Sequence, residues 1–348
     1  MSTGTIETPD RLKFDEEALA AYLNDHVDGF AGPMSVSKFA GGESNPTYLL
    51  TTPEKKYVLR RKPPGKLLPS AHAVDREYRI MTALGQQGYP VPKTHVLCED
   101  DSVIGTMFFV MDMVEGRIFW DKVIDDVTPD ERRGFFNEAI DNLARLHQID
   151  YQAAGLGDYG KPGNYFARQI ERWTKQYKAA ETTAIPEIDN LIDWLPSAVP
   201  DDDETTIVHG DYKIDNLIYA PGEPKIIATL DWELSTLGHP LADFSYFLMP
   251  WSMPQITTLG YSDVDFDAMN IPTIAEASER YCAATGRSAL PDLNFCMAYN
   301  LFRFSGIVQG VYKRALQGNA SSTNAAKYGA VVPMLGQAGW AFAKKAGA

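Results

Sequence analysis

The spacing of apolar residues divides the chain into a strand-rich part and a helix-rich part. Apolar residues recur at helical intervals over residues 14–29 and again over 71–87. Around these segments, short runs rich in β-branched and aromatic residues, bounded by glycine, proline and lysine, predict strands. The predicted strands are 36–39, 47–51, 57–60, 94–98 and 106–113. We therefore expect residues 34–113 to form a mostly antiparallel sheet with one helix inserted.

Past residue 116 the apolar pattern becomes mainly helical. A threonine followed by a proline begins a long amphipathic segment at residue 129, which is typical of a helix N-terminus. Helices are predicted over 129–149, 164–180, 186–195, 271–285, 292–317 and 321–345. Two short apolar strands among them, 206–208 and 225–230, are expected to form a hairpin. The sequence thus predicts an α+β chain with a small sheet lobe over residues 1–113 and a larger, mainly helical lobe over 114–348.

Composition and charge narrow the class of protein. The chain has 348 residues, of which 45% are hydrophobic and 22% charged, as in ordinary globular proteins. A formal net charge of -14 argues against a nucleic-acid-binding surface. The three cysteines are far apart and form no zinc or disulfide motif. No apolar run approaches the roughly 20 residues that span a bilayer, and the N-terminus is unlike a signal peptide. We expect a cytoplasmic protein that binds neither nucleic acid nor membrane. No heptad pattern or exposed apolar stripe stands out, so the sequence does not indicate the oligomeric state.

The segment 207–219 carries the most informative polar residues. An apolar strand runs into His-Gly-Asp211, and Asn216 precedes the next apolar strand. A further strand ends at Asp231, fifteen residues after Asn216. Phosphoryl transfer needs one carboxylate to accept the proton of an attacking hydroxyl, and an amide and a carboxylate to hold Mg²⁺. The alternative is a turn in which Asp211 caps backbone groups.

The N-terminal half contains residues that suit a nucleotide. Gly-Gly42-Glu-Ser44-Asn45 lies between two predicted strands, where backbone N–H groups and short hydroxyls can approach phosphates. Arg60 and Lys62 share one face of a strand, so either can reach phosphates. Glu77, in the predicted helix 71–87, can pair with Arg60. The alternatives are an ordinary hairpin turn, an exposed basic edge and a solvated helix face.

Taken in order, these motifs resemble the aminoglycoside phosphotransferase family of the protein-kinase-like superfamily. The resemblance covers about residues 30–315 and rests on His-Gly-Asp-Tyr-Lys-Ile-Asp-Asn, Leu-Asp-Trp-Glu and Gly-His-Pro-Leu-Ala-Asp. The chain is most similar to the branch that contains the kinase-like domains fused to some acyl-CoA dehydrogenases. That likeness rests on Gly-Gly-Glu-Ser-Asn, Tyr-Val-Leu-Arg-Arg-Lys-Pro-Pro-Gly and Ala-His-Ala-Val-Asp-Arg-Glu-Tyr.

The resemblance implies a two-lobed protein-kinase-like fold that binds ATP in the cleft between its lobes. By matching motif, Asp211 would be the catalytic base, and Lys213 would neutralise the transferred phosphoryl group. The Mg²⁺ ligands would be Asn216 and Asp231. The nucleotide would contact Gly42, Ser44, Asn45, Arg60 or Lys62, Glu77, Met111, Asp112 and Met113, with the last two offering backbone groups to adenine.

The implied function is transfer of phosphate from ATP, with Mg²⁺, to a hydroxyl group of a small molecule. Trp232-Glu233 stands where a protein kinase has Phe-Gly, and no Ala-Pro-Glu segment follows, which argues against a protein substrate. The acceptor would be aminoglycoside-like or a hydroxyacyl metabolite. Because Arg60 stands where kinases carry a strand lysine, the alternative is a nucleotide-binding pseudokinase with a regulatory or scaffolding role.

Overall fold

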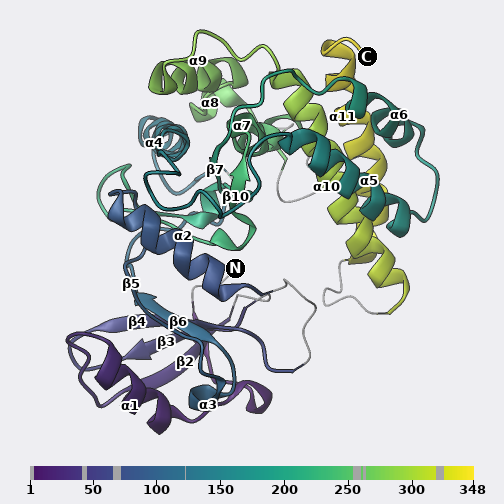
Figure 1. The fold of residues 1–348 in the computed structure, drawn as a ribbon. Coiled ribbons are helices and arrows are strands. Elements are labelled where there is room, and N and C mark those ends of the chain that lie inside the picture. The colour runs from purple at the N-terminus through teal and green to yellow at the C-terminus, as the bar shows by residue number, and fades with distance from the viewer. Residues whose placement is uncertain are drawn as a thin grey trace. The chain divides into compact units, whose positions relative to one another are not determined.

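A computed structural model describes residues 4–40, 45–65, 72–121, 123–253, 260–261, 264–318 and 325–348, with side chains from 328 in the last range. The chain divides into two compact units. The first unit contains residues 1–120, 152–156 and 214–235, and the second contains 121–151, 157–213 and 236–348. Each unit is described in turn (Figure 1).

An antiparallel sheet of six strands forms the centre of the first unit, in the order β1-β2-β3-β4-β6-β5. The strands are β1 (Thr5–Ile6), β2 (Ser35–Phe39), β3 (Thr47–Thr51), β4 (Lys56–Arg61), β5 (Thr94–Cys98) and β6 (Phe108–Asp112). A short helix, η1 (Asp10–Leu12), follows β1. The mostly antiparallel sheet expected from the sequence is confirmed.

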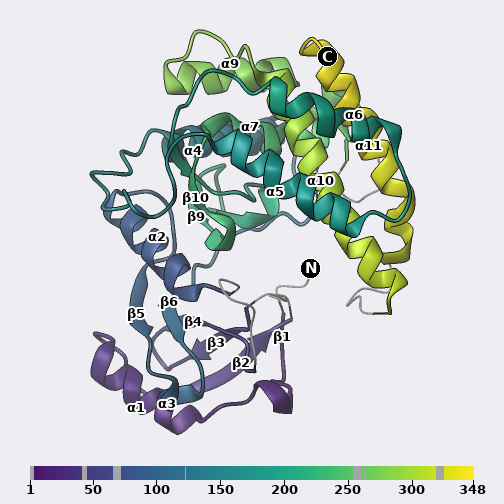
Figure 2. The same ribbon diagram turned by 45° about the vertical axis from the view of Figure 1, so that its right-hand side comes forward.

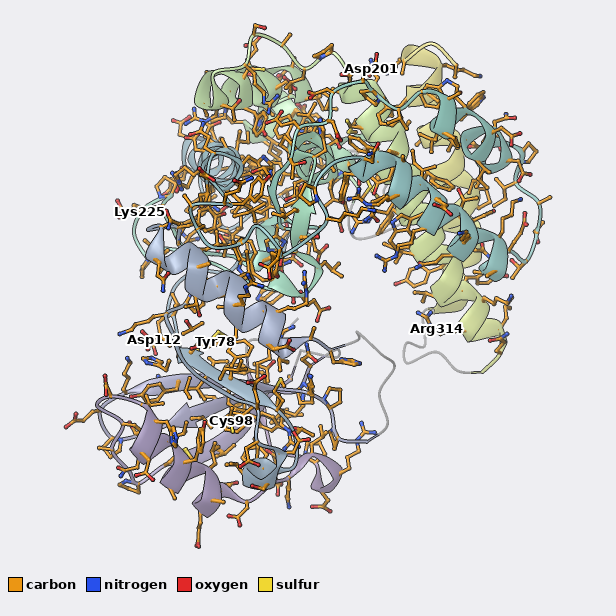
Figure 3. All side chains as sticks on the ribbon, viewed as in Figure 1. Tyr78, Cys98, Asp112, Asp201, Lys225 and Arg314 are labelled. Atoms are coloured by element: carbon orange, nitrogen blue, oxygen red, sulfur yellow. The ribbon has the colours of Figure 1, made fainter. Side chains whose placement is uncertain are left out.

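Helices cover both faces of this sheet. Helices α1 (Glu16–His26) and α3 (Asp101–Ile104) lie on one face, and α2 (Val74–Gln86) lies on the other (Figures 1 and 2). The α1 face is a buried apolar cluster that includes Leu23, Tyr57 and Leu59. On the opposite face, Tyr78 of α2 contacts the ring of Phe109 at a centroid distance of 6.0 Å (Figure 3). Since strand side chains alternate, Leu59 faces α1 and Arg60 faces α2.

A hairpin from much later in the chain belongs to this same unit. It consists of η3 (Ile214–Asn216), β8 (Leu217–Tyr219), β9 (Ile226–Thr229) and η4 (Trp232–Leu234). The Thr229 N–H donates to the carbonyl of Pro90 at 2.8 Å. The buried Trp232 ring meets the edge of the Tyr89 ring at 5.9 Å. These contacts join the hairpin to the segment between α2 and β5.

The second unit is mainly helical, with one short strand pair. β7 (Thr206–Val208) pairs with β10 (Thr236–Gly238). The hairpin expected between 206–208 and 225–230 is therefore wrong, because each of these strands has a different partner. The α-helices are α4 (Pro129–His147), α5 (Tyr165–Ala180), α6 (Pro186–Trp194), α7 (Pro240–Leu248), α8 (Phe266–Met269), α9 (Ile274–Thr285), α10 (Leu293–Leu316) and α11 (Val331–Lys345). Shorter helical turns are η2 (Leu195–Ser197), η5 (Met249–Ser252) and η6 (Ala325–Ala330).

Helix α10 is the central helix of the second unit, and both α5 and α11 pack along it (Figures 1 and 2). Glycines permit the close packing: a Cβ at Gly306 would lie 3.3 Å from the Trp173 ring of α5, and one at Gly339 of α11 would lie 3.3 Å from the Cβ of Leu301 on α10. Over the described ranges, no helix has both the length and the apolar character needed to cross a membrane.

Candidate functional site

In the second unit, the loop after β7 carries Asp211 and is fixed by a buried acid on α7. The Asp243 carboxylate accepts hydrogen bonds from the backbone N–H groups of His209 and, at 2.8 Å, of Gly210. Burial raises the pKa of Asp243, but the nearby His147 and His209 and the Gly210 N–H together lower it by more, so the net shift is downward. A charged Asp243 thus ties the loop to α7.

The Asp211 carboxylate itself has partners from two directions. Its Oδ1 accepts a hydrogen bond of 2.6 Å from the hydroxyl of Tyr246, and its Oδ2 lies 3.4 Å from Lys213 Nζ. Arg303 of α10 donates to the carbonyl of Gly210 at 2.8 Å. The structure therefore brings the predicted pair Asp211 and Lys213 together. It adds two partners of this loop that the sequence did not indicate, Tyr246 and Arg303.

In the first unit, the hairpin brings Asn216 and Asp231 to one end. Leu217 pairs with Thr229, and the Leu230 N–H donates to the Asn216 carbonyl at 2.8 Å. Asp231 has a left-handed backbone with φ 66°, a conformation that is uncommon for residues other than Gly, Asn and Asp. The amide and carboxylate oxygens of Asn216 and Asp231 are of the type that Mg²⁺ prefers.

Arg60 is the centre of an ion-pair cluster in the first unit, called here the Arg60 cluster (Arg60, Glu77, Asp231 and Glu233). Its Nε lies 3.0 Å from Glu77 Oε2, and one Nη2 reaches Asp231 Oδ1 at 3.1 Å and Glu233 Oε2 at 3.2 Å. Burial raises the pKa of Glu77 to about 7, even though the charge of Arg60 opposes that shift. The expected contact between Arg60 and Glu77 is present, whereas Glu233 was not anticipated. The sequence feature that could have indicated Glu233 is its position two residues after Asp231.

Of the other residues predicted to bind the phosphates, Asn45 is buried and Lys62 lies near an acidic side chain of α2. Asn45 is 1% exposed, and its amide nitrogen lies 3.5 Å from Glu233 Oε2. Its Oδ1 is 3.0 Å from the Nδ1 of His72, a residue with φ 61°. Lys62 Nζ lies 3.8 Å from Asp75. Gly42 and Ser44 fall outside the described residues.

The segment predicted to contact adenine is integrated into the sheet. Met111 is buried on β6. The N–H groups of Asp112 and Met113 both donate to backbone carbonyls of neighbouring sheet segments. The Asp112 carboxylate binds Lys55 Nζ at 2.6 Å and His95 Nε2 at 2.5 Å. Two N–H groups and one carboxylate of this segment therefore already bind other groups of the protein.

One group of metal-type side chains occurs among the described residues away from these positions. Asp202, Glu204 and His239 place ligand atoms within 4.8 Å of one another. His239 Nδ1 accepts the N–H of Leu241, so the neutral ring carries its proton on Nε2. Arg287 binds the Glu204 carboxylate. This group therefore has the partners of a structural ion-pair network.

The sheet with a basic strand residue paired to a helix glutamate, and the helical unit with a tied His-Gly-Asp loop, define the class: a protein-kinase-like fold. Solved structures agree. A choline kinase from Cryptosporidium parvum matches with a TM-score of 0.66 at 12% identity, covering 95% of this chain and 96% of that one. The hygromycin-binding phosphotransferase APH(4)-Ia matches with a TM-score of 0.62 at 12% identity, covering 95% and 99%. At such identities these likenesses show the fold alone.

Residues 35–277 match the phosphotransferase enzyme family APH, and the chain belongs to that family. A candidate aminoglycoside phosphotransferase from Ralstonia eutropha is 49% identical, with a TM-score of 0.89 over 96% of this chain and 99% of that chain. Acyl-CoA dehydrogenase family member 10 of Mus musculus is 43% identical over 97% of this chain and 32% of its own length. Family member 11 of Homo sapiens is 42% identical over 96% and 44%. The chain thus spans less than half of these curated relatives, and the expected resemblance is confirmed.

Proposed function

We propose that this protein transfers the γ-phosphoryl group of ATP to a hydroxyl group of a small molecule, with Asp211 as the base. The acceptor oxygen forms a bond to the γ-phosphorus as the bond to the β,γ-bridging oxygen breaks, and ADP leaves. The hydroxyl proton passes to the Asp211 carboxylate and then to water. The observation that carries the proposal is the fixed presentation of Asp211, with Oδ1 held by Tyr246 and Oδ2 beside Lys213, in a member of a phosphotransferase family.

Asn216 and Asp231 are the residues we propose to hold Mg²⁺. Their oxygens suit this cation, and Asp231 already lies 3.1 Å from a cationic group, the Arg60 guanidinium. When bound, Mg²⁺ neutralises charge on the phosphates. Arg60 or Lys62 would bind the nucleotide phosphates, and Lys213 would offset the charge of the phosphoryl group in transit. In this proposal, nucleotide binding belongs to residues 1–113 and acceptor binding to 114–348.

A groove in the second unit favours one acceptor class over the other. It lies between α5 and α10, has a volume of about 450 Å³, and is lined by Trp173, Lys313 and Arg314 among others. Arg314 lies near the end of α10 (Figure 3). No carboxylate occurs among the described lining residues. Like charges repel a polycationic aminoglycoside from such a groove, whereas an anionic acceptor is attracted. We therefore favour a hydroxyacyl metabolite, in keeping with the names of the curated relatives.

The groove connects to the proposed base through packed side chains of the same unit. Trp173 forms part of its wall, and the Arg303 guanidinium lies 5.8 Å from the Trp173 ring. Arg303 in turn donates to the carbonyl of Gly210, the residue before Asp211. A ligand in this groove would therefore touch a residue that is two contacts from the catalytic loop.

The test is ADP release from Mg·ATP with separate pools of hydroxyacyl thioesters, amino alcohols, sugars and aminoglycosides. Asp211→Asn should lower acceptor-dependent release on the order of 100- to 10,000-fold while Mg·ATP binding persists. The matched control is Asp193→Asn, an exposed aspartate of α6, which should match wild type. Undiminished turnover by Asp211→Asn would refute the assignment of the base.

The same experiment also tests the alternative, a pseudokinase with a regulatory role. If Mg·ATP binds, no pool stimulates ADP release, and a partner protein co-purifies in a 1:1 ratio, the regulatory role replaces the enzymatic one. Stimulation by aminoglycosides alone would show that the groove charges do not select the acceptor.

A further inference from the structure

We infer that Tyr246 and Arg303 are positioning residues for Asp211, which together hold the base in one orientation. This inference rests on the proposed function. Tyr246 lies on α7, three residues after Asp243, so both side chains project from the same helical turn towards the loop. The Tyr246 hydroxyl donates to Asp211 Oδ1 at 2.6 Å. This distance is short for a hydroxyl and is typical of a hydrogen bond to a charged carboxylate.

Arg303 supports this contact from a second helix. Its side chain is buried on α10, and its Nη2 donates to the Gly210 carbonyl at 2.8 Å. The guanidinium carbon lies 5.0 Å from the centre of the Tyr246 ring and 5.8 Å from that of Trp173. A cation over an aromatic face attracts the ring, most strongly when it is shielded from water. Arg303 thus fixes both the peptide before the base and the ring that binds it.

Burial lowers the pKa of Arg303, but the neighbouring phenols and Asp211 raise it by a larger amount. The net shift of the pKa is upward, so the guanidinium stays charged. The charge is therefore available for both of its contacts. Gly210 has φ 84°, so the Arg303 bond holds the chain at a position with a left-handed backbone. A loop held by Arg303 on one side and Asp243 on the other has little freedom to turn Asp211.

The consequence for the reaction follows from the two oxygens of the carboxylate. Tyr246 donates to Oδ1 while Oδ2 lies 3.4 Å from Lys213 Nζ, so the two oxygens of the base have different, fixed surroundings. Without the phenol, Asp211 can rotate about its terminal bond, and a base displaced by about 1 Å can lose about 100-fold in rate. Tyr246 therefore acts through Asp211, and its loss should lower kcat without weakening nucleotide binding.

Tyr246→Phe tests the inference because it removes the hydroxyl and keeps the ring over Arg303. We expect kcat for acceptor-dependent ADP release to fall about 10- to 100-fold, with the Kd for Mg·ATP and the Tm unchanged. The control is Tyr177→Phe on α5, whose buried hydroxyl has no hydrogen-bond partner, and which should retain wild-type kcat. Arg303→Lys keeps the charge and should retain more activity than Arg303→Met.

A double variant separates positioning from a general structural role. If Tyr246 acts through Asp211, adding Tyr246→Phe to Asp211→Asn should cause no further loss of kcat. If Tyr246→Phe lowers kcat as much in the Asp211→Asn variant as it does in the wild-type protein, the inference is overturned. Intact-mass analysis after incubation with Mg·ATP provides a second check: a phosphate found on Tyr246 would make it an acceptor and would also overturn the inference.

A measurement independent of turnover reports the contact itself. In protein labelled at tyrosine ¹³Cζ, the Tyr246 resonance, assigned by its loss in Tyr246→Phe, should shift in Asp211→Ala while that of Tyr177 does not. An unmoved Tyr246 resonance would overturn the inference. A shifted resonance in a protein that releases no ADP with any pool would refute the proposed function and support the Tyr246–Asp211 pair.

Discussion

Replacing Arg60 with methionine tests how strongly the Arg60 cluster stabilises the first unit. The Arg60 side chain is 13% exposed and Glu77 is 2% exposed, so the variant leaves a buried carboxylate without its cation. Breaking a buried ion pair by removing one partner costs about 3–5 kcal/mol. Glu77 can escape part of this cost by taking up a proton, since burial already raises its pKa to about 7. We therefore expect a loss of about 3 kcal/mol at pH 8 and a smaller loss at pH 6.

The assay is urea denaturation followed by circular dichroism at both pH values. The matched control on the same strand is Lys56→Met, which breaks the exposed ion pair with Glu115, where the side chains are 49% and 69% exposed. Exposed pairs contribute about 0–1 kcal/mol, so this variant should lose little at either pH. If Arg60→Met is no less stable than Lys56→Met, or if its deficit is the same at pH 6 and pH 8, the reasoning about the buried pair is wrong.

Three further variants probe other contacts. Asp243→Asn should destabilise the protein by about 2–3 kcal/mol, measured by thermal melting, and lower ADP release, because an amide cannot accept both loop N–H groups with a full charge. The pKa of Glu77 is about 7 in the folded protein and 4.5 in the unfolded chain, so between these pH values only the folded protein binds the proton. The free energy of unfolding therefore falls as the pH rises from 4.5 to about 7. Glu77→Gln should flatten this part of the curve of unfolding free energy against pH, and parallel curves would contradict the raised pKa. Gly116→Ala should lower the Tm because its Cβ would overlap the Tyr219 carbonyl, whereas Gly157→Ala, with nothing within 4 Å, should not; equal Tm values would show that the loop adjusts.

Local periodicity predicted most of the elements, and non-local pairing explains the failures. The helix expected over 71–87 is α2 (Val74–Gln86), and that expected over 129–149 is α4 (Pro129–His147), which a capping box at Thr128 begins. The strand β10, by contrast, is only Thr-Leu-Gly and carries no pattern of its own. It exists because β7 lies beside it, and pairing over such a distance leaves no local trace.

The candidate site shows the same division. The alternation of side chains predicted only that Arg60 and Lys62 share one face of the strand. An ion pair between Arg60 and Glu77 was one of two interpretations, and the structure places these side chains 3.0 Å apart. Tyr246 and Arg303 were missed as partners of the base because they come from α7 and α10, 35 and 93 residues from their bonding partners. Their residue types did not indicate a contact with the base, since an aromatic or basic residue on a helix is usually explained by packing or surface charge.

The hairpin of residues 214–235 has a consequence for how the protein is made. The six-stranded sheet is encoded by the first 112 residues, so it can form early in synthesis. The Arg60 cluster cannot, because two of its carboxylates, Asp231 and Glu233, emerge from the ribosome more than a hundred residues later. At about 5–20 residues per second, Arg60 and the buried Glu77 wait on the order of 10 to 30 seconds for their remaining partners. During that interval the nascent sheet carries an incomplete polar cluster, because Arg60 and Glu77 lack the two later carboxylates.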